Sequence, residues 1–201
     1  MKKVWIPAII LLLVLASLGV AQALWSQNLT TNVTTSTGAW STTLNLDPTA
    51  ASDKTGVLHN FNTTELAKLA ADDGQRYTTV NSWSYSYDDM NHYLEFKFSP
   101  GMTAGSIDSV NLNFIWTPGL KITNAKLRIS GDKGSTWQDY NMGFTGGSEN
   151  TVSLNLKSSP YNIYSYTKVN NLVIRFEATS YSSGTGRTTA HDWVQVDVVY
   201  H

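Results

Sequence analysis

Residues 24–33 read LWSQNLTTNV, and this stretch decides the fold class that the sequence predicts. Successive side chains on a β-strand point to opposite faces. One face of the stretch therefore carries Trp25, Leu29 and Val33, whereas the other is wholly polar. A strand of this kind buries one face and exposes the other. We expect residues 24–37 to form a strand that completes a hydrophobic core, either its own or a neighbour's.

Three N-glycosylation sequons begin at Asn28, Asn32 and Asn62. Asn28 and Asn32 both fall on the polar face of the predicted strand. We expect all three asparagines to be exposed, and to carry N-glycans in a host with the machinery.

Residues 1–23 have the three parts of a secretory signal peptide. Lys2 and Lys3 precede an apolar run, and Ala21-Gln22-Ala23 supplies the small residues that a signal peptidase reads. The alternative is a retained membrane anchor, but the apolar run is short for a span. The pattern predicts cleavage after Ala23 and a secreted protein, extracellular or at the cell surface, with no membrane segment after cleavage.

Composition excludes several classes of function. The net charge is −1 and 14% of residues are charged, so no strong field attracts nucleic acid. The chain has no cysteine, which excludes thiol catalysis and thiolate metal sites. After cleavage the chain is long enough for one domain with a sizeable core, and we assign residues 38–201 to it.

Most of the remaining sequence alternates between apolar and polar residues, with Gly, Pro, Ser and Asn at the turns. This pattern predicts an all-β, antiparallel two-sheet β-sandwich of eight to ten strands, jelly-roll-like or immunoglobulin-like, with an N-terminal donor strand. One short helix is expected at residues 64–71, capped by Thr64. Residues 49–62 are expected to form a loop, and residues 76–87 a strand.

Enzyme chemistry is not indicated. The four histidines are scattered without metal spacing, and the pair His191-Asp192 is interpreted as a turn before the last strand. Residues 130–137 resemble the Asp-box of sialidase-type propellers, which is a structural hairpin, so a hairpin turn is expected at Asp132. We predict no catalytic residue, no metal and no cofactor.

Tyr161, Tyr164 and Tyr166 lie in a loop-like stretch and are candidates for sugar contacts by stacking. Aromatic residues are also the normal filling of strand cores. The alternative function is therefore a monomeric cell-surface carbohydrate-binding or adhesin sandwich.

The leader ending in Ala-Gln-Ala and the following LWSQNLTTNVTTSTGAW resemble the start of the TasA-like biofilm fibre proteins, in particular the archaeal bundling pilins. The resemblance covers residues 1–46 at the level of motifs. One bacterial branch of that family is classed with metallopeptidases, but this chain has no recognisable zinc motif.

The resemblance implies a secreted subunit of a pilus or biofilm matrix fibre that polymerises head-to-tail by donor-strand complementation. The partner would be another copy of the same chain, forming a homopolymer. Leu24, Trp25, Leu29 and Val33 would anchor the donated strand. The alternative is that the strand folds back into its own sheet and leaves a monomer.

Overall fold

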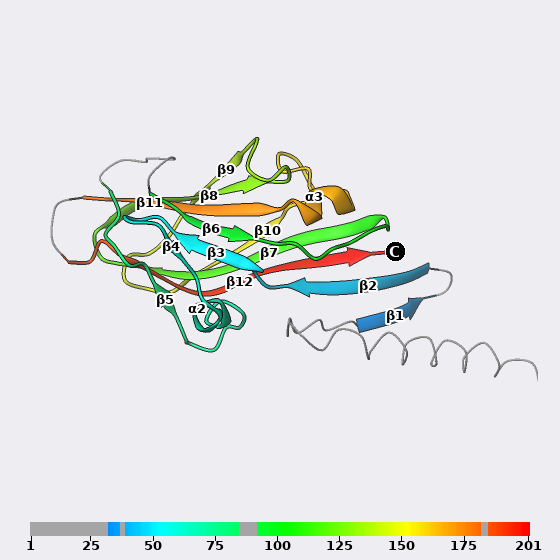
Figure 1. The fold of residues 1–201 in the computed structure, drawn as a ribbon, viewed down its shortest axis with the longest axis horizontal. Helices are drawn as coiled ribbons and strands as arrows, with labels where there is room; N and C mark the ends of the chain where they lie inside the picture. Colours follow the sequence, from blue (N-terminus) through cyan, green and yellow to red (C-terminus); the bar gives the residue numbers. More distant parts are fainter. Residues whose placement is uncertain (1–31, 37–38, 85–91, 182–184) are drawn as a thin grey trace, which may run out of the picture.

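The computed structural model describes residues 32–36, 39–84, 92–181 and 185–201, with residues 32–36 and 39–40 described by their backbone. Two six-stranded antiparallel sheets pack face to face, which confirms the predicted jelly-roll-like β-sandwich (Figure 1). The first sheet has the order β1-β2-β12-β7-β10, with β5 paired to β12. The second has the order β4-β3-β6-β11-β8-β9.

The strands of the first sheet are β1 (Asn32–Ser36), β2 (Ala39–Leu46), β5 (Tyr77–Thr78), β7 (Ile107–Pro118), β10 (Asn150–Asn155) and β12 (Thr189–Tyr200). The strands of the second are β3 (Ala50–Asp53), β4 (His59–Asn60), β6 (Leu94–Lys97), β8 (Ile122–Ser130), β9 (Gln138–Met142) and β11 (Val173–Ser180). β3 and β4 fall within the expected loop at residues 49–62, so that prediction is wrong. Ala51 is buried there and pairs with Phe96 of β6, and this pairing makes the segment a strand.

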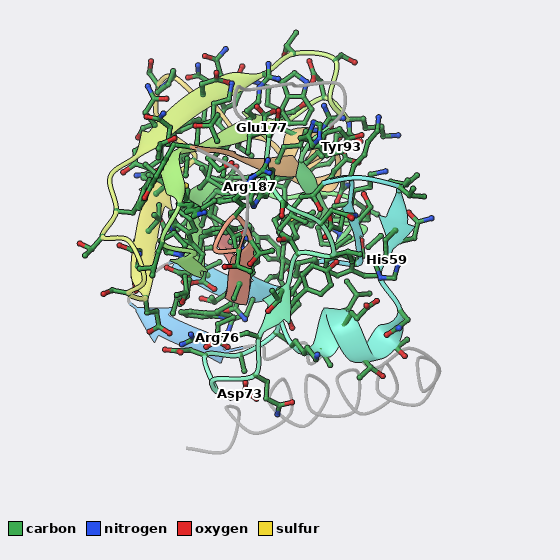
Figure 2. All side chains as sticks on the ribbon, turned by 90° about the vertical axis from the view of Figure 1, so that its left-hand side faces the viewer. His59, Asp73, Arg76, Tyr93, Glu177 and Arg187 are labelled. Carbon is green, nitrogen blue, oxygen red and sulfur yellow. The ribbon has the colours of Figure 1, made fainter. Side chains whose placement is uncertain are left out.

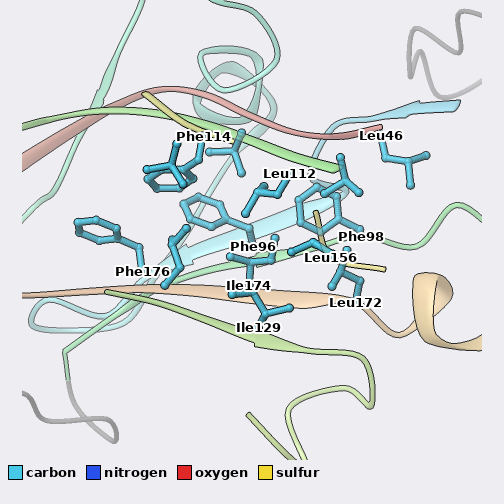
Figure 3. Close-up of a cluster of buried hydrophobic side chains, with 14 of the residues drawn as sticks. Leu46, Phe96, Phe98, Leu112, Phe114, Ile129, Leu156, Leu172, Ile174 and Phe176 are labelled. Carbon is cyan, nitrogen blue, oxygen red and sulfur yellow. The ribbon is translucent and has the colours of Figure 1, made fainter. Parts of the chain in front are cut away.

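The core lies between the inner faces of the two sheets (Figure 3). Phe114 of β7 is fully buried, with its ring centroid 6.0 Å from that of Phe96 and 5.7 Å from that of Phe176. Because alternate residues of each strand enter this layer, the two-residue period of the sequence predicts most of it.

The first helix differs from its prediction. α2 spans Thr63–Ala67, and Asn62, not Thr64, is its N-cap. The Asn62 side chain accepts from the Glu65 amide at 3.0 Å, and Glu65 Oε2 accepts from the Asn62 amide at 2.9 Å. This capping box satisfies two free amides and starts the helix earlier than expected. A second short helix, α3 (Tyr166–Asn170), was not predicted; Ser165 caps it and Val169 is its buried residue.

A strand is expected at residues 76–87; residues 76–84 form only the two-residue β5, and residues 85–87 lie outside the described residues. After β5 the chain crosses the end of the sandwich, where the amides of Thr79 and Trp83 donate to the carbonyls of Thr189 and Arg187. Trp83 is fully buried and closes the core, and its indole donates to Thr189 Oγ1 at 3.0 Å. Figure 2 views the sandwich from this end, with Arg187 near the centre. Within this stretch Tyr77 belongs to a strand, whereas Trp83 closes the end of the core.

His191 and Asp192 do not form the expected turn. Both are buried within β12, where the register shifts between His191 and Trp193. The His191 ring lies 4.7 Å from the Phe176 ring and 5.5 Å from the Phe114 ring, between centroids. This irregularity in the register lets β12 continue through His191 and Asp192, where the sequence predicts a turn.

Candidate functional site

β1 is an edge strand that pairs with β2 alone among the described strands. The pairing is antiparallel, from Asn32 opposite Thr43 to Ser36 opposite Ala39. The start of β2 lies at the same end of the sandwich as the C-terminus (Figure 1). A strand held on one side only, close to a chain end, is the element that can leave its sheet at least cost.

The register of β1 relates its residues to those of β2. Val33 lies opposite Thr42, and Thr42 shares a face of the sheet with Leu44 and Leu46, which are buried in the core. Asn32 lies opposite Thr43 and therefore belongs to the other face. Leu24, Trp25, Asn28 and Leu29 lie outside the described residues, so their predicted roles stay predictions.

The third sequon lies at the start of α2. Asn62 is exposed, as predicted, and its side-chain oxygen caps the helix. The side-chain oxygen of Asn62 accepts the capping hydrogen bond. The side-chain nitrogen, to which a glycan would be attached, takes no part in the cap.

The side of the sandwich between β9 and β10 holds features that the sequence did not reveal. β9 ends one sheet and β10 ends the other, and neither has a second neighbouring strand among the described residues. Four half-buried side chains on β9, β10 and the loops beside them pack against the core: Tyr140, Phe144, Leu154 and Tyr161. The sequence-level signal for β9 was weak, because QDYNM offers one short alternation of Tyr140 and Met142.

The opposite side is filled. The segment that carries α2 reaches from one sheet to the other, since the Phe61 amide donates to the Ala51 carbonyl and the Val194 amide donates to the Leu69 carbonyl. Leu69 is fully buried. Among the described residues, the segment that carries α2 covers one side of the sandwich, and the other side ends in the strand edges of β9 and β10.

A shallow hollow of about 160 Å³ lies between the β8–β9 turn and residues 160–163, and the Ile163 amide donates to the carbonyl of Leu156, the residue that follows β10. Ile129 and Ile163 are its buried lining, and Tyr161, Gln138 and Asp132 are among its remaining walls. Hydrogen bonds from Thr136 and Ser130 lower the pKa of Asp132 to about 2. These bonds confirm the hairpin turn predicted at Asp132, between β8 and β9.

The three candidate tyrosines do not form one platform. Tyr161 is half-buried at the hollow, and its pKa is raised by burial and by the neighbouring Tyr140. Tyr164 is 56% exposed, but Lys168 Nζ lies 4.5 Å from the centre of its ring. Tyr166 is exposed at the start of α3. Tyr161 is half-buried and Tyr164 is in contact with Lys168, which disfavours a shared stacking surface.

The outer face of the second sheet carries charges that pair with one another. Arg175 Nε lies 2.7 Å from Glu95 Oε2, and the guanidinium carbon lies 4.1 Å from the Tyr93 ring centre and 4.6 Å from that of Trp137. Arg128 stacks on the same Trp137 ring at 5.5 Å. Cross-strand pairs of this kind stabilise a sheet.

Within the described part of the chain, no three His, Cys, Asp or Glu side chains come close enough to hold a metal ion. Burial lowers the pKa of His191 to about 3, and its Nε2 lies 2.8 Å from Thr189 Oγ1. A fully buried ring of this kind has no access to a substrate. Neither described helix is long and apolar enough to cross a membrane.

No protein-family model matches the sequence, and no curated protein matches it. Among solved structures, the chain is similar to the Tobacco streak virus coat protein, at 8% identity over 64% of this chain and 87% of that one, with a TM-score of 0.28. It is also similar to a structure of infectious bursal disease virus, Gt strain, at 14% identity over 73% and 36%, with a TM-score of 0.29. Scores this low carry no inference about function.

Proposed function

We propose that this protein is a secreted structural subunit of an extracellular filament, a pilus or biofilm matrix fibre of the TasA-like type. Each subunit donates the strand that begins at Leu24 to the next subunit, so the polymer grows head-to-tail by donor-strand complementation. The protein has no enzymatic role, and its partner is another copy of itself.

The position of β1 carries this proposal. It is an edge strand with one partner among the described strands, and the uncharged sequence before it continues the same alternation of apolar and polar residues. Separation of β1 from β2 leaves the pairings of β2 with β12 and of β12 with β7 in place. An exchange of this kind is an economical route to assembly, and a contact between different surfaces of successive copies generates a filament rather than a closed ring.

A reversible disulfide bond between β1 and β2 tests this proposal. Thr34 and Ser41 lie directly opposite each other, at a separation that suits a disulfide in an antiparallel pair. Because the chain has no native cysteine, Thr34→Cys with Ser41→Cys creates one bond only. We expect the oxidised double variant to be secreted as a monomer and to form filaments after reduction, as seen by electron microscopy.

Either single-cysteine variant is the control and should assemble in both redox states. Filaments of normal appearance from the oxidised double variant would show that β1 does not leave β2, and donor-strand exchange would be wrong.

The alternative is a monomeric carbohydrate-binding sandwich, favoured by the exposure of Tyr164 and Tyr166 beside the hollow. Because Tyr161 is half-buried and Tyr164 contacts Lys168, sugar binding by these tyrosines is the weaker candidate. It expects a monomer whose affinity for a sugar falls when Tyr164 is replaced by Ala.

A further inference from the structure

We propose that the acceptor for the donated strand is the free edge of β10, and that the hollow at the end of β10 receives Trp25 of the neighbouring subunit. This assignment rests on the proposed function and names the surface on which it acts. The segment that occupies this edge is residues 24–36 of a second copy of this chain.

Strand direction selects the edge. β10 is antiparallel to β7, β7 to β12, and β12 to β2, so β10 and β2 run in opposite directions. When β1 separates from β2, residues 24–36 extend outward from the N-terminal end of β2, beyond Ala39. Their chain direction is then the same as that of β2. In a filament whose subunits all point the same way, that strand is antiparallel to the next subunit's β10 and parallel to its β2.

The remaining edges fit less well. β4 has only two residues, so a strand paired with it would form few backbone hydrogen bonds. β9 is parallel to β11, whose last residue, Ser180, accepts a hydrogen bond from Arg187 just before β12 begins. β9 therefore runs with β2, and the donated strand would meet it in the parallel sense, which is slightly less stable per residue.

The side chains beside β10 match the donated strand. Tyr140, Leu154 and Tyr161 are half-buried apolar side chains already packed on the core. A strand added to the edge of β10 would cover them with its apolar face while its backbone completes the sheet. The donated segment has no charged residue, so none would be left unpaired beside them.

The hollow lies where the far end of such a strand would arrive. An antiparallel partner places its C-terminal residues near Asn150 and its N-terminal residues beyond Asn155. Trp25 to Ser36 spans roughly 37 Å when extended, whereas six-residue β10 spans roughly 20 Å, so the strand is long enough to pass β10. A cavity of about 150 Å³ can hold a benzene ring. The hollow is of similar size and has both apolar and polar walls, which suits an indole.

Photo-crosslinking in intact filaments tests the assignment. Full-length Ser26→Cys is labelled with a benzophenone maleimide, mixed with ¹⁵N-labelled unmodified subunits, assembled and illuminated, so that mass spectrometry counts only adducts between subunits. We expect adducts at residues 138–142 and 150–163.

The outcomes separate the two proposals. Filaments whose adducts fall on residues 42–46 of the neighbour would overturn the β10 assignment and leave strand donation intact. A labelled protein and a wild type that both form no filaments would overturn the proposed function and this assignment with it.

A matched pair of leucines gives a second readout. Leu154→Asp, on β10, should raise the concentration needed for assembly roughly tenfold or more. Leu120→Asp, at a 75% exposed site in the turn after β7, should leave it unchanged. Thermal melting of the secreted monomers shows whether each variant is folded. Equal assembly by two folded variants contradicts the assignment.

Discussion

At the scale of the single residue, His191 shows how a polar side chain can belong to a core. It lies within β12 among phenylalanine rings, and its ring forms a hydrogen bond with Thr189 Oγ1, which also accepts from the Trp83 indole. Burial lowers its pKa from 6.5 to about 3. The imidazole thus stays neutral in the folded state under conditions in which the unfolded chain protonates it.

This difference makes stability depend on pH. The stabilisation is complete above pH 6.5 and is lost as the pH falls towards 3, because only the unfolded chain binds the proton. Between pH 7 and pH 5 we expect the free energy of unfolding to fall by about 2 kcal/mol. His191→Phe should remove most of this slope, as measured by urea unfolding at each pH.

Carboxylates respond in the opposite sense. Burial raises the pKa of Asp47, Asp192 and Asp197, so their contribution grows as the pH falls. The comparison is therefore made between wild type and variant at the same pH, where these contributions cancel. Identical slopes in the two proteins would contradict the role given to His191.

At the scale of the element, α2 places a sequon and a helix cap on the same asparagine. The capping box ties Asn62 to Glu65, and hydrogen bonds from the Asn62 backbone and from His59 lower the pKa of Glu65 despite its partial burial. Thr64 completes the sequon but takes no part in the cap. Substitution at the two positions therefore separates glycosylation from helix stability.

Asn62→Ala should lower the free energy of unfolding of the unglycosylated protein by about 1 kcal/mol, because an amide at the helix start loses its acceptor. Thr64→Ala should have little effect on that protein, and both variants should lose any glycan at this site. Chemical denaturation and intact mass measure the two effects. Equal stability of the variants would show that the cap contributes nothing.

At the scale of the whole molecule, the proposed assembly requires cleavage of the leader before Leu24. If the leader were retained, the strand would not begin at a free end and could not enter a neighbour. We expect N-terminal sequencing of the extracellular protein to begin at Leu24. Finding Met1 instead would indicate an anchored protein and would remove the free donor strand from the proposal.

The sequence by itself determined the sandwich, most of its core and the phase of its strands. The reason is physical: alternation with a period of two residues is local, and it records which side of a strand is buried. It therefore placed Leu44, Phe114 and Ile174 in the core.

Only the tertiary structure decided which strands are neighbours and which edges stay bare. The use of Trp83 to close an end, the place of His191 inside β12 and the gathering of Tyr140, Leu154 and Tyr161 on one side depend on contacts between residues far apart in the chain. A two-residue period cannot encode such contacts. Strand direction, which selects β10 as the proposed acceptor, is a property of the assembled sheet and of no segment alone.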